Sequence, residues 1–400
     1  MYLHNTLPNH DHPLDPRDAQ TLGIAGANNV ARLLTLRKNS APTPLVALPG
    51  LAKGLNLGAL HLKDEGHRLG LGSFKALGGA YALMRLVQDR AERQLGRSIP
   101  IDAILSDEVR NIARSMTFAC ATDGNHGRSV AQGARLMGAK AVIFVHAGVS
   151  QSRIDAIAGF GAQITRVAGN YDDSVAEASS VAEEQGWTVL SDTSWPGYED
   201  IPGLVMQGYT AIVREALAEL PMPPTHVFLQ AGVGGFAAAV AGHLAVLLGK
   251  GRPHITVVEP ARAACVLASA KQNQPVKVDE TEPTVMAMLE CYEPSLVAFR
   301  VLERVADGFM TVDEDDAVSV MRRLADPIAG DPAVVAGESG GVGLAGAITV
   351  LNDPELAARI GLGADARLLV INTEGATDPA LYTSLIGRTP EAVLQAERIA

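Results

Sequence analysis

The 400-residue sequence predicts an α/β protein made of two doubly wound open-sheet lobes with a ligand in the cleft between them. From residue 116 onward, short apolar runs of strand length alternate with longer helical segments, which is the spacing of βαβ units and of mainly parallel sheets. This alternation occurs in two successive sets. The composition, 47% apolar with 40 glycines, is typical of glycine-rich α/β enzymes. Ligands of such folds bind at the carboxyl ends of the strands.

The first hundred residues introduce this pattern. We expect a helix over 18–36, then a proline turn leading into a short apolar helix within 43–56, and a strand over 60–63. The apolar spacing predicts a helix over 76–95, whereas 97–115 reads as an irregular connection.

The two alternating sets follow in order. In the first, the expected strands and helices are 117–121, 126–138, 141–146, 151–160, 163–167, 172–185 and 188–191. In the second, they are a helix near 203–219, a strand at 226–230, a helix at 236–248, a strand at 255–259, a helix from 261, helices near 315–325 and 341–351, and a strand at 368–372.

Charge and cysteine content exclude several classes of protein. The net charge is -11 and no Lys/Arg run is present, so we expect no nucleic-acid partner. The three cysteines lack CxxC spacing, which indicates neither a disulfide framework nor a metal site and favours a reducing, cytoplasmic compartment. The longest apolar run, 232–249, contains many Gly and Ala residues and His243, so it predicts a buried helix rather than a membrane span. No signal peptide is visible at the N-terminus.

Lys75 is the first candidate for chemistry. It lies in GLGSFKALGGAYA (70–82), directly before the expected helix. The helix dipole and the apolar neighbours should both lower the pKa of its amine, which would suit a Schiff-base nucleophile. A lone lysine at a helix start is more often a surface residue, so the assignment depends on the other motifs.

Two loops that follow expected strands carry glycines and polar residues. In TDGNHGR (122–128), the glycines beside Asn125 let the backbone approach a ligand, and Asp123 supplies an acid or base; an Asx turn or N-cap is the alternative. In QAGVGG (230–235), backbone N–H groups at a helix start predict a phosphate cradle. The Gly-x-Gly-x-x-Ala pattern there, with Glu259 ending the next strand, also mimics a dinucleotide fingerprint.

Three further loops complete the set. In 191–198, Asp192 could pair with a substrate amine or merely cap a helix. In 372–378, Thr373 could hydrogen-bond a ring nitrogen. The turn 337–341 reads as a tight helix start capped by Ser339.

Pyridoxal 5'-phosphate suits the whole set, because its aldehyde takes a lysine, its phosphate takes a glycine loop and its ring serves as an electron sink. With SFKALGGAYA, TDGNHGR, QAGVGG and NTEGATD, the chain resembles the fold type II pyridoxal-phosphate enzymes from about residue 43 to 378. The Asp before GNHG, the SDTSWPGY loop and NTEG resemble, more narrowly, the diaminopropionate ammonia-lyases.

The resemblance implies a role for each motif. Lys75 would form the Schiff base and act as base for L-substrates, Asp123 would be the base for D-substrates, and Asp192 would position the substrate. Cofactor contacts would come from Asn125 at the ring hydroxyl, from Gly232, Val233, Gly234 and Gly235 at the phosphate, and from Thr373 at the pyridine nitrogen. Substrate contacts would come from Thr122, Asp123, Gly124, His126 and Asp192.

The implied organisation is a homodimer whose large cofactor-binding domain spans 1–92 and 193–400, with a small domain, 93–192, inserted in it. The implied reaction is α,β-elimination of 2,3-diaminopropionate to pyruvate and ammonia.

The sequence departs from the family pattern in two places. Where those enzymes resemble TIMAGLACGEP, this chain has TVMAMLECYEP (284–294), and it has GSFK where NAFK is expected. The alternatives are therefore a serine/threonine-type dehydratase or a lyase of another 3-substituted 2-amino acid. More remote ones are an NAD-dependent dehydrogenase and a non-catalytic amino-acid binding protein.

Overall fold

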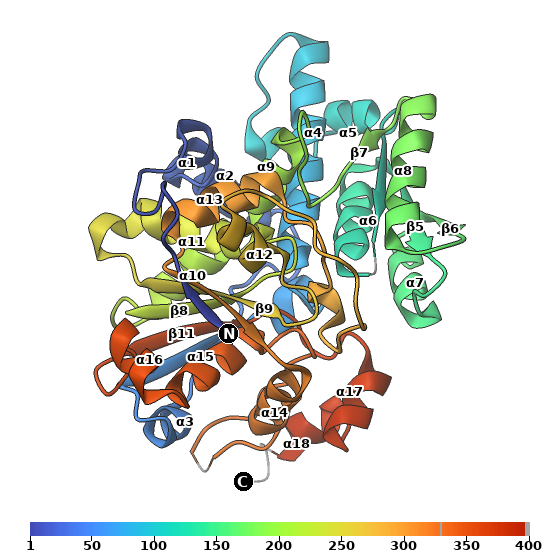
Figure 1. Cartoon of the computed structure of the whole chain (residues 1–400). Helices are drawn as coiled ribbons and strands as arrows, with labels where there is room; N and C mark the ends of the chain where they lie inside the picture. Colours follow the sequence, from blue (N-terminus) through green and yellow to red (C-terminus); the bar gives the residue numbers. More distant parts are fainter. Residues whose placement is uncertain (123, 329, 397–400) are drawn as a thin grey trace.

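The computed structural model describes residues 1–122, 124–328 and 330–396, and it contains two separate β-sheets with helices packed around them (Figure 1). Within these residues, the larger sheet has seven strands in the order β1-β10-β9-β8-β11-β3-β2, and the smaller has four in the order β6-β5-β4-β7. The predicted α/β fold with two open sheets is confirmed.

The strands of the larger sheet are, in that order, β1 (Tyr2–His4), β10 (Gly308–Val312), β9 (His254–Pro260), β8 (His226–Gln230), β11 (Arg367–Asn372), β3 (Ala59–Asp64) and β2 (Leu45–Ala47). The smaller sheet consists of β6 (Gln163–Val167), β5 (Lys140–His146), β4 (Thr117–Ala121) and β7 (Thr188–Val189). Among the strands of the described residues, β1 and β2, at the two edges of the larger sheet, pair antiparallel, and the other pairs in both sheets are parallel. All five residues of β8 are buried, as expected for a strand covered on both faces.

The helices are α1 (Pro16–Thr21), α2 (Ile24–Thr35), α3 (Pro49–Gly54), α4 (Lys75–Leu95), α5 (Asp107–Ala113), α6 (Asn125–Met137), α7 (Gln151–Ala158), α8 (Tyr171–Gln185), α9 (Asp200–Gly208), α10 (Thr210–Glu219), α11 (Gly235–Leu248), α12 (Cys265–Gln272), α13 (Leu296–Val305), α14 (Glu314–Ala325), α15 (Val342–Leu351), α16 (Pro354–Ile360), α17 (Pro379–Ile386) and α18 (Pro390–Ala396). Short 3₁₀ helices are η1 (Glu65–Gly70), η2 (Ile101–Ala103), η3 (Gly249–Gly251) and η4 (Ala287–Leu289).

Several expected elements are wrong in detail. The single helix expected over 18–36 is broken into α1 and α2 at Gly23, where a Cβ would lie 2.6 Å from the Ala19 carbonyl oxygen. The helix near 203–219 is likewise two helices, which meet at Tyr209. The connection 97–115 is not irregular, because it contains α5, capped by the Ser106 hydroxyl. Strands β1, β2 and β10 were not expected; the two edge strands are three residues long, too short to show a periodicity.

A buried ion network lies beneath the segment that leads to α4. The Arg68 guanidinium is fully buried and donates to Glu65 (2.7 and 2.8 Å) and to Glu215 of α10 (2.7 and 2.8 Å). The buried Lys63 ammonium of β3 lies 2.9 Å from the Glu215 carboxylate and donates to the Thr43 carbonyl oxygen at 2.6 Å. These contacts join η1, β3 and α10 just before the chain reaches Lys75.

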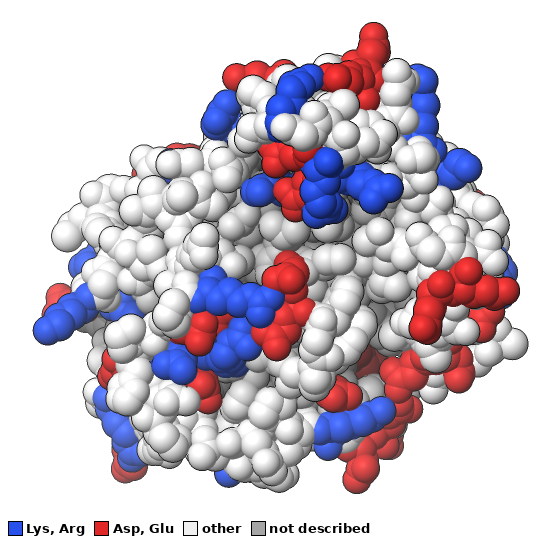
Figure 2. Space-filling view, turned by 90° about the horizontal axis from the view of Figure 1, so that it is seen from above, with Lys and Arg blue, Asp and Glu red and all other residues white. Residues whose placement is uncertain are grey.

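On the face drawn in Figure 2, basic and acidic side chains form mixed groups near the middle and top, whereas acidic side chains gather toward the lower right. None of the helices in the described part of the chain combines the length and apolarity that crossing a membrane requires.

Candidate active site

Lys75 is the first residue of α4, and its backbone is held by neighbours from the larger sheet. The N–H of Phe74 donates to the carbonyl of Thr373 (3.0 Å), and Ser73 forms a β-bridge with Glu374. The Phe74 ring packs on Tyr209 and Phe236 at centroid distances of 4.8 and 4.7 Å. The lysine segment therefore lies against the end of β11 and the start of α11.

The Lys75 ammonium donates to Oδ2 of Asp192 at 2.5 Å, so Asp192 pairs with the lysine instead of capping a helix. Burial lowers the pKa of Lys75, as the sequence suggested, but the Asp192 carboxylate more than offsets burial and raises that pKa well above its usual range. The expectation of a lowered lysine pKa is therefore wrong. Burial raises the pKa of Asp192, whereas Lys75 and His126 lower it, and the net shift is downward.

The loop after β4 is closed by Thr122. Its Oγ1 accepts the N–H groups of Gly124 (3.0 Å) and Gly127 (3.1 Å), and Gly124 has φ +155°, which favours glycine. The Asn125 amide Nδ2 donates to Oε2 of Glu374 at 2.8 Å, so this loop meets the end of β11. Asp123, the expected second base, lies outside the described residues.

His126 lies next to the Lys75–Asp192 pair. Its Nε2 hydrogen-bonds to the Leu190 carbonyl at 2.9 Å, and its Nδ1 is 3.9 Å from Oδ2 of Asp192. Within the described part of the chain, the buried Nδ1 has no hydrogen-bond partner. Because burial lowers the pKa of His126, a neutral ring whose Nδ1 accepts a ligand hydrogen is the state that this environment favours.

The glycine loop at the start of α11 forms an anion cradle. Gly234 has φ +92°, and a Cβ on Gly232 would lie 2.9 Å from the Cys291 sulfur. In the described structure, the N–H groups of residues 232–235 donate to no protein acceptor. A Cβ on Gly235 would lie 3.6 Å from the Asp192 carbonyl, so the cradle adjoins the residue that holds Lys75. Unpaired N–H groups at the N-terminus of a 14-residue helix suit a phosphate.

Gln230 and Thr373 connect the ends of two neighbouring strands. The buried Gln230 amide Nε2 donates to Oγ1 of Thr373 at 2.9 Å and to the carbonyls of Gly340 (2.6 Å) and Ile371 (3.0 Å). The QAGVGG pattern by itself indicates no role for Gln230. Its contacts were not visible because its partners lie more than a hundred residues away.

Sequence reasoning also missed two acidic side chains. Glu374 and Glu338 are both buried, and burial raises their pKa values, that of Glu374 to about 8. Both residues lie in motifs already noted, NTEG and GESGG. The signal that could have found them is an acidic residue within an otherwise apolar segment. The expected helix cap by Ser339 is wrong, because α15 has Gly341 as its N-cap and the Ser339 hydroxyl accepts the N–H of Met288 at 3.2 Å.

The divergent segment 284–294 covers the glycine loop. Leu289 contacts the Gly232 side of the cradle, and the Tyr292 hydroxyl donates to Oε1 of Glu290 at 2.6 Å. The two bulkier polar residues of this segment therefore pair with each other.

The loop after β7 carries a stacked aromatic pair. The rings of Trp195 and Tyr198 lie 4.2 Å apart at an interplanar angle of 11°, and Trp195 is 36% exposed. The Tyr198 hydroxyl donates to the Val189 carbonyl at 2.9 Å, which fixes this loop six residues beyond Asp192.

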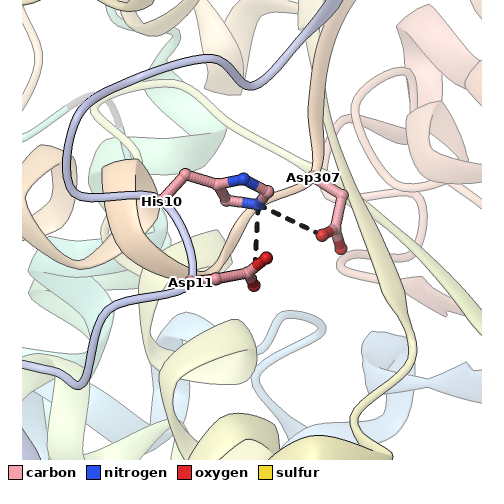
Figure 3. A group of neighbouring side chains, drawn as sticks. All are labelled: His10, Asp11 and Asp307. Carbon is pink, nitrogen blue, oxygen red and sulfur yellow. Dashed lines mark hydrogen bonds and ion pairs between the residues drawn. The ribbon is translucent and has the colours of Figure 1, made fainter.

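Two features outside this site resemble a ribose anchor and a metal site, but their contacts do not support either function. Glu259 is buried and accepts the N–H groups of Val266 (2.8 Å) and Leu267 (2.7 Å), so it caps α12 and does not offer a ribose anchor. His10, Asp11 and Asp307 gather as a metal site would (Figure 3), with His10 Nε2 3.3 Å from Asp307. However, Arg252 already forms ion pairs with both carboxylates, at 2.7 Å (Asp11) and 2.6 Å (Asp307).

Comparison with known proteins identifies the class of protein. Residues 36–374 match the family model described as "Pyridoxal-phosphate dependent enzyme". The chain is 39% identical over 359 residues to the diaminopropionate ammonia-lyase of Escherichia coli K12, covering 88% of this chain and 89% of that protein. It is also 29% identical to the L-threonine dehydratase of Escherichia coli K12 over 309 residues, covering 76% of this chain and 51% of that protein.

Solved structures agree. The crystal structure of Escherichia coli diaminopropionate ammonia-lyase in complex with D-serine has 34% sequence identity and a TM-score of 0.86, covering 98% of both chains. Threonine deaminase isoform 2 from Solanum lycopersicum, at 20% identity and a TM-score of 0.73, shares the fold.

The chain therefore belongs to the pyridoxal-phosphate dependent enzymes. Within them, it groups with the diaminopropionate ammonia-lyases.

Proposed function

We propose that this enzyme catalyses α,β-elimination of 2,3-diaminopropionate, consuming one water and giving one pyruvate and two ammonia per substrate. The observation that carries the proposal is the Lys75–Asp192 pair beside the glycine cradle, in a chain that aligns with diaminopropionate ammonia-lyases over most of its length.

The residues present fit pyridoxal phosphate. The unpaired N–H groups of 232–235 would hold its phosphate, and Lys75 would take its aldehyde. Asn125 would lie at the ring hydroxyl and Thr373 at the pyridine nitrogen. When bound, the cofactor supplies an electron sink for the bond broken at the substrate Cα.

The protein's own groups would move the protons. Lys75 would take the Cα proton of an L-substrate and Asp123 that of a D-substrate, and the ammonium of Lys75 could return a proton to the departing β-nitrogen. Asp192 would hold that ammonium in place. Thr122, Gly124 and His126 would bind the substrate carboxylate and amine.

The test is the release of pyruvate and ammonia from D- and L-2,3-diaminopropionate by the holoenzyme. Lys75→Ala should lower kcat by roughly 10³-fold or more, whereas Lys53→Ala, an exposed lysine on α3, should leave it unchanged. Asp123→Asn should reduce turnover of the D-isomer more than that of the L-isomer. Full activity in Lys75→Ala, or equal loss for both isomers in Asp123→Asn, would contradict these roles.

A serine/threonine-type dehydratase is the second candidate, favoured by the paired Glu290 and Tyr292 in the divergent segment. It would use the same lysine and cradle but would release ammonia from serine or threonine. Comparing kcat/KM for diaminopropionate, serine and threonine separates the two functions.

We also propose a homodimer in the cytoplasm, with lobes comprising 1–92 plus 193–400 and 93–192. The dimer rests on the resemblance, and the compartment is supported by the buried thiols of Cys120 and Cys265. The lobe boundaries are supported by the smaller sheet, whose four described strands all lie within 93–192. Light scattering of the purified enzyme would measure the oligomeric state.

A further inference from the structure

Two buried carboxyl groups, Glu374 beside Asn125 and Glu338, which acts on Glu374, lack the partners that buried charges require. Glu338 is 1% exposed and Glu374 is 3% exposed. Within the described residues, neither carboxyl oxygen of Glu338 has a hydrogen-bond partner, and Oε1 of Glu374 has none either. A buried carboxylate is normally paired or takes up a proton, so this pair needs a cation or a proton.

Arg153 supplies a cation from the opposite sheet. It belongs to α7, which packs on the smaller sheet, and its Nη2 lies 3.7 Å from Oε1 of Glu338. Its side chain is 17% exposed. A Cβ on Gly124 would lie 3.4 Å from Cδ of Arg153, so the stem of this arginine passes over the loop that carries Asn125.

The charged groups around the pair compete. Burial raises the pKa of both carboxyls, that of Glu374 to about 8, and Glu338 raises the pKa of Glu374 further. Asp378, at the start of α17, also raises the pKa of Glu338. Arg153 lowers both pKa values; Asn125 and Thr377, which donate to Glu374, lower its pKa too.

The charge on Glu374 determines how the Asn125 amide is held. An ionised carboxylate only accepts, so it binds the Nδ2 end of the amide, as in this structure. A protonated carboxyl can donate instead, and it then also accommodates the amide turned over, with Oδ1 toward Glu374.

We propose that Arg153 is a positioning residue: acting on Glu338 and Glu374, it favours the ionised form of Glu374 and thereby biases which end of the Asn125 amide meets the cofactor. The inference rests on the cofactor contact proposed for Asn125. It gives Arg153, on a helix beside the smaller sheet, an electrostatic effect on carboxyl groups that lie beside the larger sheet.

The first test compares Arg153→Met with Arg135→Met, which removes an exposed arginine of α6 whose contact is the Gly159 carbonyl. The visible absorbance of the cofactor in the holoenzyme is measured against pH, and the midpoint is the pH of half-maximal change. The cofactor dissociation constant is measured by equilibrium dialysis after the cofactor has been removed from the protein. In Arg153→Met, the absorbance midpoint should rise by about 1 pH unit because the carboxyl pair loses its cation. Cofactor affinity should fall about 10-fold. Arg135→Met should match the parent protein in both.

A double-mutant cycle separates this role from a merely structural one. In a Glu338→Gln background, replacing Arg153 should shift the midpoint much less than it does in the parent, and Arg153→Lys should restore most of the parental midpoint. If Arg153→Met leaves the midpoint unchanged, or shifts it equally in both backgrounds, the proposal is wrong.

Separate control measurements address the folding of the variants and the overall reaction. If Arg153→Met lowers the unfolding temperature strongly, Arg153→Lys carries the test, because retained charge then predicts a retained midpoint. Since midpoint and affinity are read without substrate, failure to release pyruvate from diaminopropionate would overturn the proposed reaction and not the role of Arg153.

Discussion

The candidate site shows how far single residues can be predicted. The place of Lys75 at a helix start was correctly predicted from the apolar spacing after it. The direction of its pKa shift was not, because that depends on Asp192, 117 residues later. The local sequence shows the helix dipole and the apolar neighbours of Lys75. The charge nearest its amine, Asp192, belongs instead to a loop that follows a strand of the smaller sheet.

The Lys75–Asp192 contact predicts the ionisation of the lysine. In cofactor-free protein, Asp192→Asn should lower the pKa of Lys75 by about 1–3 units, because burial then acts without the opposing carboxylate. The pH dependence of Lys75 carbamylation by cyanate, followed by mass spectrometry, measures this. Asp102→Asn, at an exposed ion pair with Arg32, is the control and should change nothing. An unchanged or raised pKa would show that Asp192 does not govern the lysine.

At the scale of elements, strands and helices were predicted best where their pattern is long. Strands β4, β6 and β8 have the predicted limits, and α4 begins one residue before its predicted start. Helix ends were predicted less well when the capping group comes from elsewhere in the chain. Helix α12, expected from residue 261, begins at Cys265, where the Glu259 carboxylate meets its first N–H groups.

This cap predicts a pH-dependent stability. Burial raises the pKa of Glu259 to about 8, against backbone hydrogen bonds that lower it. With a folded-state pKa above the unfolded one, its stabilising contribution is fully present below about pH 4.5 and is lost as pH rises through about 8.

Glu259→Gln removes this titration and keeps a carbonyl acceptor. The variant should gain about 4 kcal/mol in free energy of unfolding relative to the parent between about pH 5 and pH 9. Urea unfolding at several pH values measures the difference, with the exposed Glu183→Gln of α8 as control. A constant difference across this range would mean that Glu259 stays ionised throughout.

At the scale of the whole molecule, the two-sheet α/β architecture was predictable but the order of the strands was not. β1 and β10 pair residues 2–4 with 308–310, a register that no local pattern encodes. The same holds for the network of Arg68, Glu65, Lys63 and Glu215, whose members are dispersed over 150 residues and become buried only when the fold is complete.

Breaking that network should destabilise the fold. Arg68→Met leaves Glu65 buried without its main cation, so the free energy of unfolding should fall by about 3–5 kcal/mol. Arg97→Met, which removes an exposed pair with Glu108, should cost less than about 1 kcal/mol. Urea denaturation at fixed pH compares them, and similar losses in the two variants would show that burial adds nothing to the Arg68 contacts.

The stacked pair of Trp195 and Tyr198 has an optical consequence. The chain contains only two tryptophans, Trp187 and Trp195, and the indole of Trp195 lies half-exposed in the loop that holds Asp192. Fluorescence emission from this indole therefore reports on the loop beside the active site without an attached dye. With Trp187→Phe, Trp195 becomes the sole indole emitter, and energy transfer to a bound chromophore can be followed in real time.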